Sequence, residues 1–154
     1  MIKLRRQDKY PDTKWFKWYN ANPKGRLTTG DCAVRAIVGV TAKDWKTVLL
    51  ELTQLGLPDG RVFNDRVIYD KYLENLGFIK FKQPRDKRNN LKITGKRFVE
   101  QYDGPFVAHI GGCHFTCGNH GRIYDTWDCT DGTIGNYWVP TNYANQVIGK
   151  EWRH

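Results

Sequence analysis

Three side chains whose types could together perform nucleophilic chemistry lie far apart along this chain. Cys32 follows Gly30-Asp31 and opens an apolar run that predicts a buried helix, so its thiol would lie in the first helical turn. The unpaired N–H groups and the positive dipole end at a helix start favour a thiolate and can stabilise an oxyanion. Cys32 is therefore a candidate nucleophile, and the alternative is a small buried cysteine, which is common.

A histidine and an acid flank a strong hairpin signal. Residues 118–121 read Gly-Asn-His-Gly, which predicts a tight turn that brings residue 125 or 126 opposite His114. Asp125 would then accept a hydrogen bond from the imidazole, fix its tautomer and stabilise the imidazolium. Trp127 would share that face of the strand and shield the bond. Asp128 is the rival acid, but its opposite parity predicts that it points out of the site.

The order Cys, His, acid resembles that of papain-like cysteine peptidases. Asp125-Thr126-Trp127 is similar to their Asn-Ser-Trp motif, and residues 30–37 resemble the Gly-Asn-Cys motif of OTU deubiquitinases, a branch of the same superfamily. The segments around His114 and Trp127 are also similar to small stand-alone papain-like proteins of phages and bacteria. This resemblance implies a thiol protease that hydrolyses peptide or isopeptide bonds with a catalytic triad of Cys32, His114 and Asp125, supported by Trp127.

One position departs from the papain pattern. The family has a Gln six residues before the nucleophile, where it completes the oxyanion hole, and this chain has Arg26 there. The second oxyanion donor is therefore open among four polar residues upstream of the nucleophile: Asn20, Asn22, Thr28 and Thr29.

A zinc site is the main competing interpretation of five Cys and His residues near the hairpin: Cys113, His114, Cys117, His120 and Cys129. On a strand, Cys113 and Cys117 would lie about 13 Å apart, and His114 would point to the opposite face. One tetrahedral zinc with Zn–S bonds of about 2.3 Å cannot reach both thiols on a strand, although it could if this segment were a loop. We expect no metal, and we expect no cofactor. We expect Cys113, Cys117 and Cys129 to be core or edge thiols, His109 to be structural and His120 to lie in the turn.

Hydrophobic periodicity predicts helices before strands. Apolar residues at helical spacing predict helices at about 31–39, 41–56, 64–76 and 94–102. Short strands are expected at 106–110, 113–117, 122–127 and 133–139. This order predicts one α+β domain over residues 1–154, with an N-terminal helical lobe, a C-terminal twisted antiparallel sheet and the active site between them.

Basic residues are concentrated in two segments of a chain with a formal net charge of +9. Residues 1–30 carry +6, residues 80–97 carry +7, and the remainder carries −4. We expect residues 1–27 to form a basic, aromatic arm and residues 80–93 a mobile surface loop, with residues 80–97 steering an acidic partner. The alternative function is a non-enzymatic binding protein that uses these segments for nucleic acid or an acidic protein.

The composition also limits where the chain works. No apolar run reaches the roughly 18 residues of a membrane span, and the N-terminus lacks the apolar region of a secretory signal. Four cysteines without a signal are expected to be free thiols. We therefore expect a cytoplasmic monomer that acts on a protein or peptide substrate.

Overall fold

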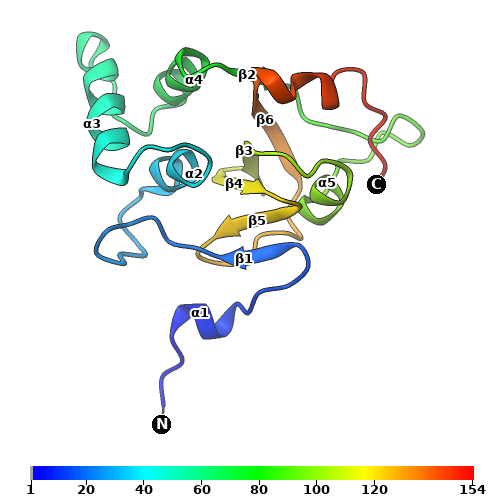
Figure 1. Cartoon of the computed structure of the whole chain (residues 1–154), viewed down its shortest axis with the longest axis horizontal. Helices are drawn as coiled ribbons and strands as arrows, with labels where there is room; N and C mark the ends of the chain where they lie inside the picture. The colour runs from blue at the N-terminus through cyan, green and yellow to red at the C-terminus, as the bar shows by residue number, and fades with distance from the viewer. Residues whose placement is uncertain (1) are drawn as a thin grey trace.

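A six-stranded sheet in the order β1-β5-β4-β3-β6-β2 forms the centre of this computed structural model, which describes residues 2–154 (Figure 1). The four middle strands pair antiparallel with one another: β3 (Phe106–Ile110), β4 (His114–Asn119), β5 (Arg122–Asp125) and β6 (Ile134–Pro140). These are the four strands that the sequence predicts.

Two further strands close the edges of the sheet. β1 (Phe16–Trp18) pairs in parallel with β5, and β2 (Phe78–Phe81) pairs antiparallel with β6. The expectation of a purely antiparallel, C-terminal sheet is therefore wrong, because the sheet is mixed and takes one strand from the N-terminal arm. The fold is α+β.

The predicted helices are all present. They are α2 (Cys32–Val40), α3 (Trp45–Gly56), α4 (Arg66–Asn75) and α5 (Gly95–Gln101). The chain also forms a short helix α1 (Arg6–Lys9) and the 3-10 segments η1 (Leu57–Asp59) and η2 (Thr141–Gln146). Asp44 rather than Thr41 caps α3, because its carboxylate accepts the Thr47 N–H. Within residues 2–154, no helix is long and apolar enough to cross a membrane.

Each face of the sheet packs against its own group of helices. On one face, α2, α3 and α4 bury apolar side chains against Val107, Phe115 and Trp138. On the other face, α5 and the C-terminal segment pack against Phe106 and Ile110. Neighbouring residues of β3 thus serve opposite cores, as the alternation of a strand requires. The helix that begins at Cys32 is consequently pressed onto the strands that carry His114 and Asp125 (Figure 1).

Gly39 sets how closely α2 approaches β4. A Cβ atom at this position would lie 2.5 Å from the Cys117 Sγ atom, a distance that real contacts do not reach. We expect Gly39→Ala to lower the free energy of unfolding, because overpacking costs about 1–3 kcal/mol whereas alanine adds only about 1 kcal/mol of helix propensity. Urea unfolding measures the change. Cys117→Ala in the Gly39→Ala background should restore part of the loss, and independent, additive effects would contradict this close packing.

The segment expected to be a mobile basic loop is anchored to the fold. Its first two residues belong to β2, Ile93 is fully buried, and the buried carboxylate of Asp86 accepts hydrogen bonds from Arg88. Arg85 also pairs with Lys92 in an isolated bridge. Residues 82–92 thus form an irregular, largely exposed segment, as expected of a surface loop, and the buried Ile93 and an internal ion pair anchor it; its mobility stays a prediction.

Candidate active site

A buried polar network fixes the start of the helix that carries Cys32. Asp31 precedes the helix, but its carboxylate does not cap it. Instead, the buried carboxylate accepts hydrogen bonds from Asn22 Nδ2 at 3.1 Å and Trp45 Nε1 at 2.9 Å, and forms an ion pair with Arg35. Burial alone would raise the pKa of Asp31, but these hydrogen bonds and the Arg35 charge lower it. An ionised Asp31 thus holds the helix start in position.

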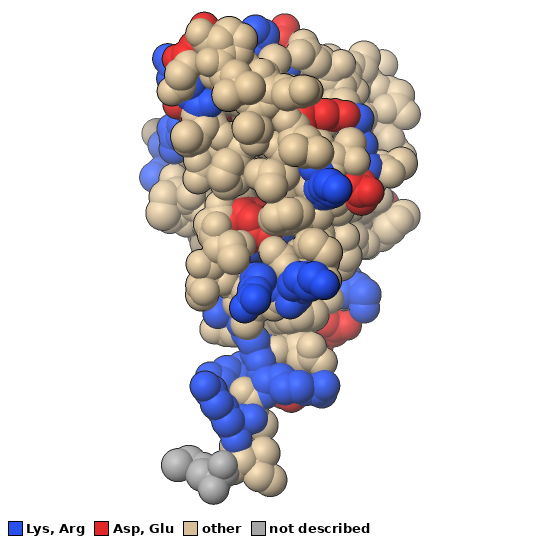
Figure 2. Space-filling model, turned by 90° about the vertical axis from the view of Figure 1, so that its left-hand side faces the viewer, with Lys and Arg blue, Asp and Glu red and all other residues tan. Residues whose placement is uncertain are grey.

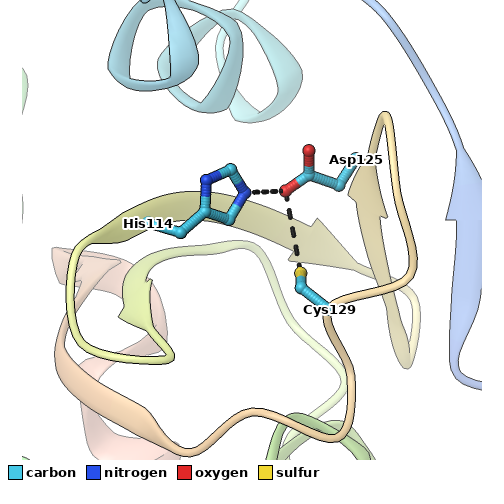
Figure 3. A group of neighbouring side chains, drawn as sticks. All are labelled: His114, Asp125 and Cys129. Carbon is cyan, nitrogen blue, oxygen red and sulfur yellow. Dashed lines mark hydrogen bonds and ion pairs between the residues drawn. The ribbon is translucent and has the colours of Figure 1, made fainter.

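His114 and Asp125 form a direct hydrogen bond. Nε2 of His114, at the start of β4, lies 2.6 Å from Oδ2 of Asp125, at the end of β5 (Figure 3). The Thr116 hydroxyl donates to the same oxygen at 2.6 Å, and the Thr126 N–H donates to Oδ1 at 2.7 Å. The Asp125 carboxylate is therefore buried with both oxygens hydrogen bonded, and its position is closely defined.

The hairpin register differs slightly from the one expected. Cys117 pairs with Tyr124, so one further step sets Thr116, and not His114, opposite Asp125. His114 reaches Asp125 diagonally, which long polar side chains on neighbouring strands can do. Thr116 is thus a hydrogen-bond partner that we missed, although the two-residue turn at His120 and Gly121 would have given this register.

The electrostatics of the site favour a charged imidazole and a charged thiol. Burial opposes the charged form of His114, yet hydrogen bonds to Asp125, Cys129 and Cys32 raise its pKa to about 11. Burial likewise raises the pKa of Cys32, but hydrogen bonding to His114, its charge and the Phe115 backbone N–H outweigh burial and lower it. These opposite shifts are those of a thiolate–imidazolium pair.

Trp127 lies beside the imidazole, as the sequence predicts, but for another reason. Its ring centroid is 5.1 Å from that of His114, with the planes tilted by 50°. β5 ends at Asp125, so a bend rather than continued strand alternation places Trp127 there.

Asp128, the rival acid, is engaged elsewhere. Its carboxylate accepts hydrogen bonds from the backbone N–H and the hydroxyl of Thr130 at 3.0 and 2.6 Å, which is an ordinary turn interaction.

Cys129 is the second group that the sequence analysis did not assign to the site. Its Sγ atom lies 3.7 Å from Asp125 Oδ2 (Figure 3). The same sulfur lies 3.9 Å from Thr116 Oγ1. Burial raises the pKa of the Cys129 thiol, so it remains a neutral donor that supports the carboxylate. The irregular segment between β5 and β6 folds back toward Asp125 and places Cys129 there. The spacing of residues in the sequence does not indicate this fold-back.

The side chains considered as second oxyanion donors divide into two groups. Nδ2 of Asn20 donates to the Arg26 carbonyl at 3.1 Å, and Nδ2 of Asn22 donates to Asp31. Both amides therefore serve the turn before Cys32. Thr28 and Thr29 are exposed in that turn. The backbone N–H of Phe115, which the sequence analysis did not consider, faces the Cys32 thiol instead.

The five residues first weighed as a zinc cluster do not share one site. Cys113 is exposed, Cys117 is buried beneath α2, and His120 lies in the hairpin turn. A different trio, His114, Asp125 and Cys129, brings one nitrogen, one oxygen and one sulfur within 4.8 Å of one another. Zinc accepts such donors, but in a tetrahedron with bonds of about 2.0–2.2 Å, N and O ligands lie roughly 3.3 Å apart. The 2.6 Å contact between His114 and Asp125 fits a hydrogen bond better.

His109 has a structural environment, as expected. It is buried on β3 with Nε2 2.8 Å from the Tyr69 hydroxyl, and burial lowers its pKa to about 4.

The candidate site therefore consists of the Cys32 thiol, the His114 imidazole between it and the Asp125 carboxylate, and the Trp127 indole beside the imidazole. Such a line of groups can activate a sulfur nucleophile and pass its proton onward. No protein-family model, curated protein or solved structure matches this chain.

Proposed function

We propose that the chain is a cysteine-dependent hydrolase that cleaves peptide or isopeptide bonds and adopts a papain-like arrangement of helix and sheet. One observation carries the proposal: the thiol at the start of a buried helix meets an imidazole that is hydrogen bonded to a buried carboxylate. A nucleophile, a base and a group that orients the base are the components of covalent acyl transfer. In this assignment Cys32, His114 and Asp125 are catalytic, and Trp127 shields the His–Asp bond from water.

The proposed reaction starts from the ion pair. Because Nε2 of His114 is hydrogen bonded to Asp125, Nδ1 is the nitrogen that takes the Cys32 proton. The thiolate attacks the substrate carbonyl carbon, and the Cys32 backbone N–H, at the helix start, stabilises the oxyanion. The C–N bond then breaks as the imidazolium protonates the leaving amine. Water, deprotonated by His114, hydrolyses the thioester, which releases the acid and regenerates the thiol.

We propose a protein or peptide substrate, because cleavage of an amide bond needs both a nucleophile and a proton donor for the leaving amine. The thiolate and the imidazolium are these two groups. The four free cysteines suit a reducing compartment, so we assign the activity to a cytoplasmic monomer. The chain needs no cofactor for the steps above, since each proton transfer uses His114.

The reactivity of Cys32 tests the nucleophile assignment. At about pH 6, an ordinary thiol with a pKa near 8.5 is only about 0.3% thiolate, whereas the pKa of Cys32 is lowered. We expect iodoacetamide to label Cys32 at least about tenfold faster than the exposed Cys113, as measured by peptide mass spectrometry. In urea the four thiols should react at similar rates. Faster labelling of Cys113 in the folded protein would rule out Cys32 as the activated thiol.

A further inference from the structure

The two basic segments differ in their position relative to the site. The segment 80–97 starts in β2, at the sheet edge opposite to β1, and ends at the start of α5, which packs on the face of the sheet opposite to α2 and contacts β5 there. Four of its eight basic side chains form ion pairs within the fold: Lys80 with Asp70, Arg88 with Asp86, Lys96 with Asp131, and Arg97 with Glu100. That residues 80–97 steer an acidic partner therefore stays a prediction.

The N-terminal arm, in contrast, lies directly along the strand that ends at Asp125. Trp18 of β1 pairs with Asp125, and the Tyr19 N–H donates to the Asp125 carbonyl at 2.8 Å. Arg6 donates from Nε to the carbonyl of Thr126, the next residue, at 2.8 Å. Figure 2 shows this side of the molecule, where Lys and Arg gather over the lower half and outnumber Asp and Glu.

A buried asparagine places two further cations next to the nucleophile. Oδ1 of Asn22 accepts the backbone N–H groups of Lys24 at 2.9 Å and Arg26 at 3.1 Å, while its Nδ2 donates to Asp31. The turn that presents Lys24 and Arg26 is thus fastened to the residue directly before Cys32. Both side chains are exposed, and neither has an ion-pair partner among residues 2–154.

We infer that this surface, formed by Arg6, Lys24 and Arg26, selects polypeptide substrates with an acidic segment beside the bond to be cleaved. The inference rests on the proposed function and names its substrate class. Opposite charge near a site raises association rates and favours the complementary partner. An acidic polypeptide fits better than a nucleic acid, because the thiolate needs an amide and because Tyr19 and Leu27, each 36% exposed, offer apolar contacts on the same arm.

The experiment compares two peptides that share one cleavable sequence and differ only in Asp/Glu or Asn/Gln flanks. We expect the wild-type protein to cleave the acidic-flank peptide with a higher kcat/KM at low salt, and the preference to shrink as salt screens the charges. In Lys24→Gln/Arg26→Gln the preference should fall about 3- to 20-fold, the range for two exposed ion pairs. The matched control is Lys82→Gln/Lys87→Gln, which removes two exposed charges from the segment 80–97 and should keep the preference.

Binding to the Cys32→Ala protein, followed by fluorescence anisotropy with the same peptides, separates this inference from the proposed function. Charge-dependent binding that Lys24→Gln/Arg26→Gln weakens supports the surface, even if no peptide is hydrolysed. Equal binding of both peptides, or equal losses in the two double variants, overturns it. A single-stranded DNA of equal charge is included as a competitor; if it binds more tightly than the acidic peptide through the same residues, the surface is a nucleic-acid site and the inference is wrong.

Discussion

Replacing His114 with Asn should lower the rate of peptide-bond hydrolysis by about 10²- to 10⁴-fold, the contribution of a positioned general acid–base group. The imidazole is the group that lowers the pKa of Cys32, and it is the proton donor for the leaving amine. Without it, the thiol returns toward its ordinary pKa and the amine leaves unprotonated. The measurement is kcat/KM on a peptide that the wild-type protein cleaves.

His120→Asn provides a matched control for this substitution. His120 lies in the hairpin turn with a φ of 52°, a left-handed conformation that asparagine accepts well. The same chemical change six residues away should therefore leave hydrolysis close to wild type and the fold intact. If His114→Asn retains more than about a tenth of the activity while His120→Asn behaves normally, His114 does not supply the acid–base step.

Replacing Asp125 with Ala should lower turnover by about 10- to 10⁴-fold, with the lower end favoured because a Cys–His pair can hold its own ion pair. Asp125 accepts from His114, Thr116 and Thr126. Its loss leaves buried donors unpaired and frees the imidazole to rotate. Asp128→Ala should cost far less, since the Asp128 carboxylate serves only the turn at Thr130. The comparison uses the same peptide assay for both variants.

Two controls separate a catalytic effect of Asp125 from a loss of folding. Asp125→Asn keeps the shape and one acceptor oxygen, so its activity should lie between those of the alanine variant and the wild type. The pH profile is the second control. The hydrogen bond to Asp125 raises the pKa of His114, and the imidazolium is lost as the pH rises through that value. Removal of the carboxylate should shift the alkaline limb of activity to lower pH. A larger loss at Asp128, with both variants folded, would exclude Asp125 as the orienting acid.

The regular elements could be predicted from sequence because each has a local cause. Helical spacing of Trp45, Val48, Leu49 and Leu52 predicted α3, and Gly77, with a φ of 87°, ended α4 as expected. β1 escaped prediction because it has only three residues and pairs with β5, more than a hundred residues later. Pairing over such a separation leaves no trace in local periodicity.

The sequence predicted the proximity of His114 and Asp125 in the candidate site, but not the residues that support them. Turn chemistry at residues 118–121 was sufficient to bring His114 close to Asp125, even though the register was displaced. The supporting thiol of Cys129 reaches Asp125 through an irregular segment, whose path depends on tertiary packing. The charge counts of residues 1–30 and 80–97 were similar, and only the fold showed that β1 pairs with the strand that ends at Asp125, whereas residues 80–97 lead to the face of the sheet opposite to α2.

The central claim is that Cys32 cleaves amide bonds, and hydrolysis of a mixed pool of peptides and isopeptide-linked peptides tests it most directly. The pool is incubated with wild-type protein and with Cys32→Ala, and mass spectrometry identifies new amino and carboxyl termini. Our account predicts a defined set of cleavages with the wild-type protein and their absence with Cys32→Ala. Cleavage that persists in Cys32→Ala, or a pool that the folded wild-type protein leaves intact, would contradict the claim.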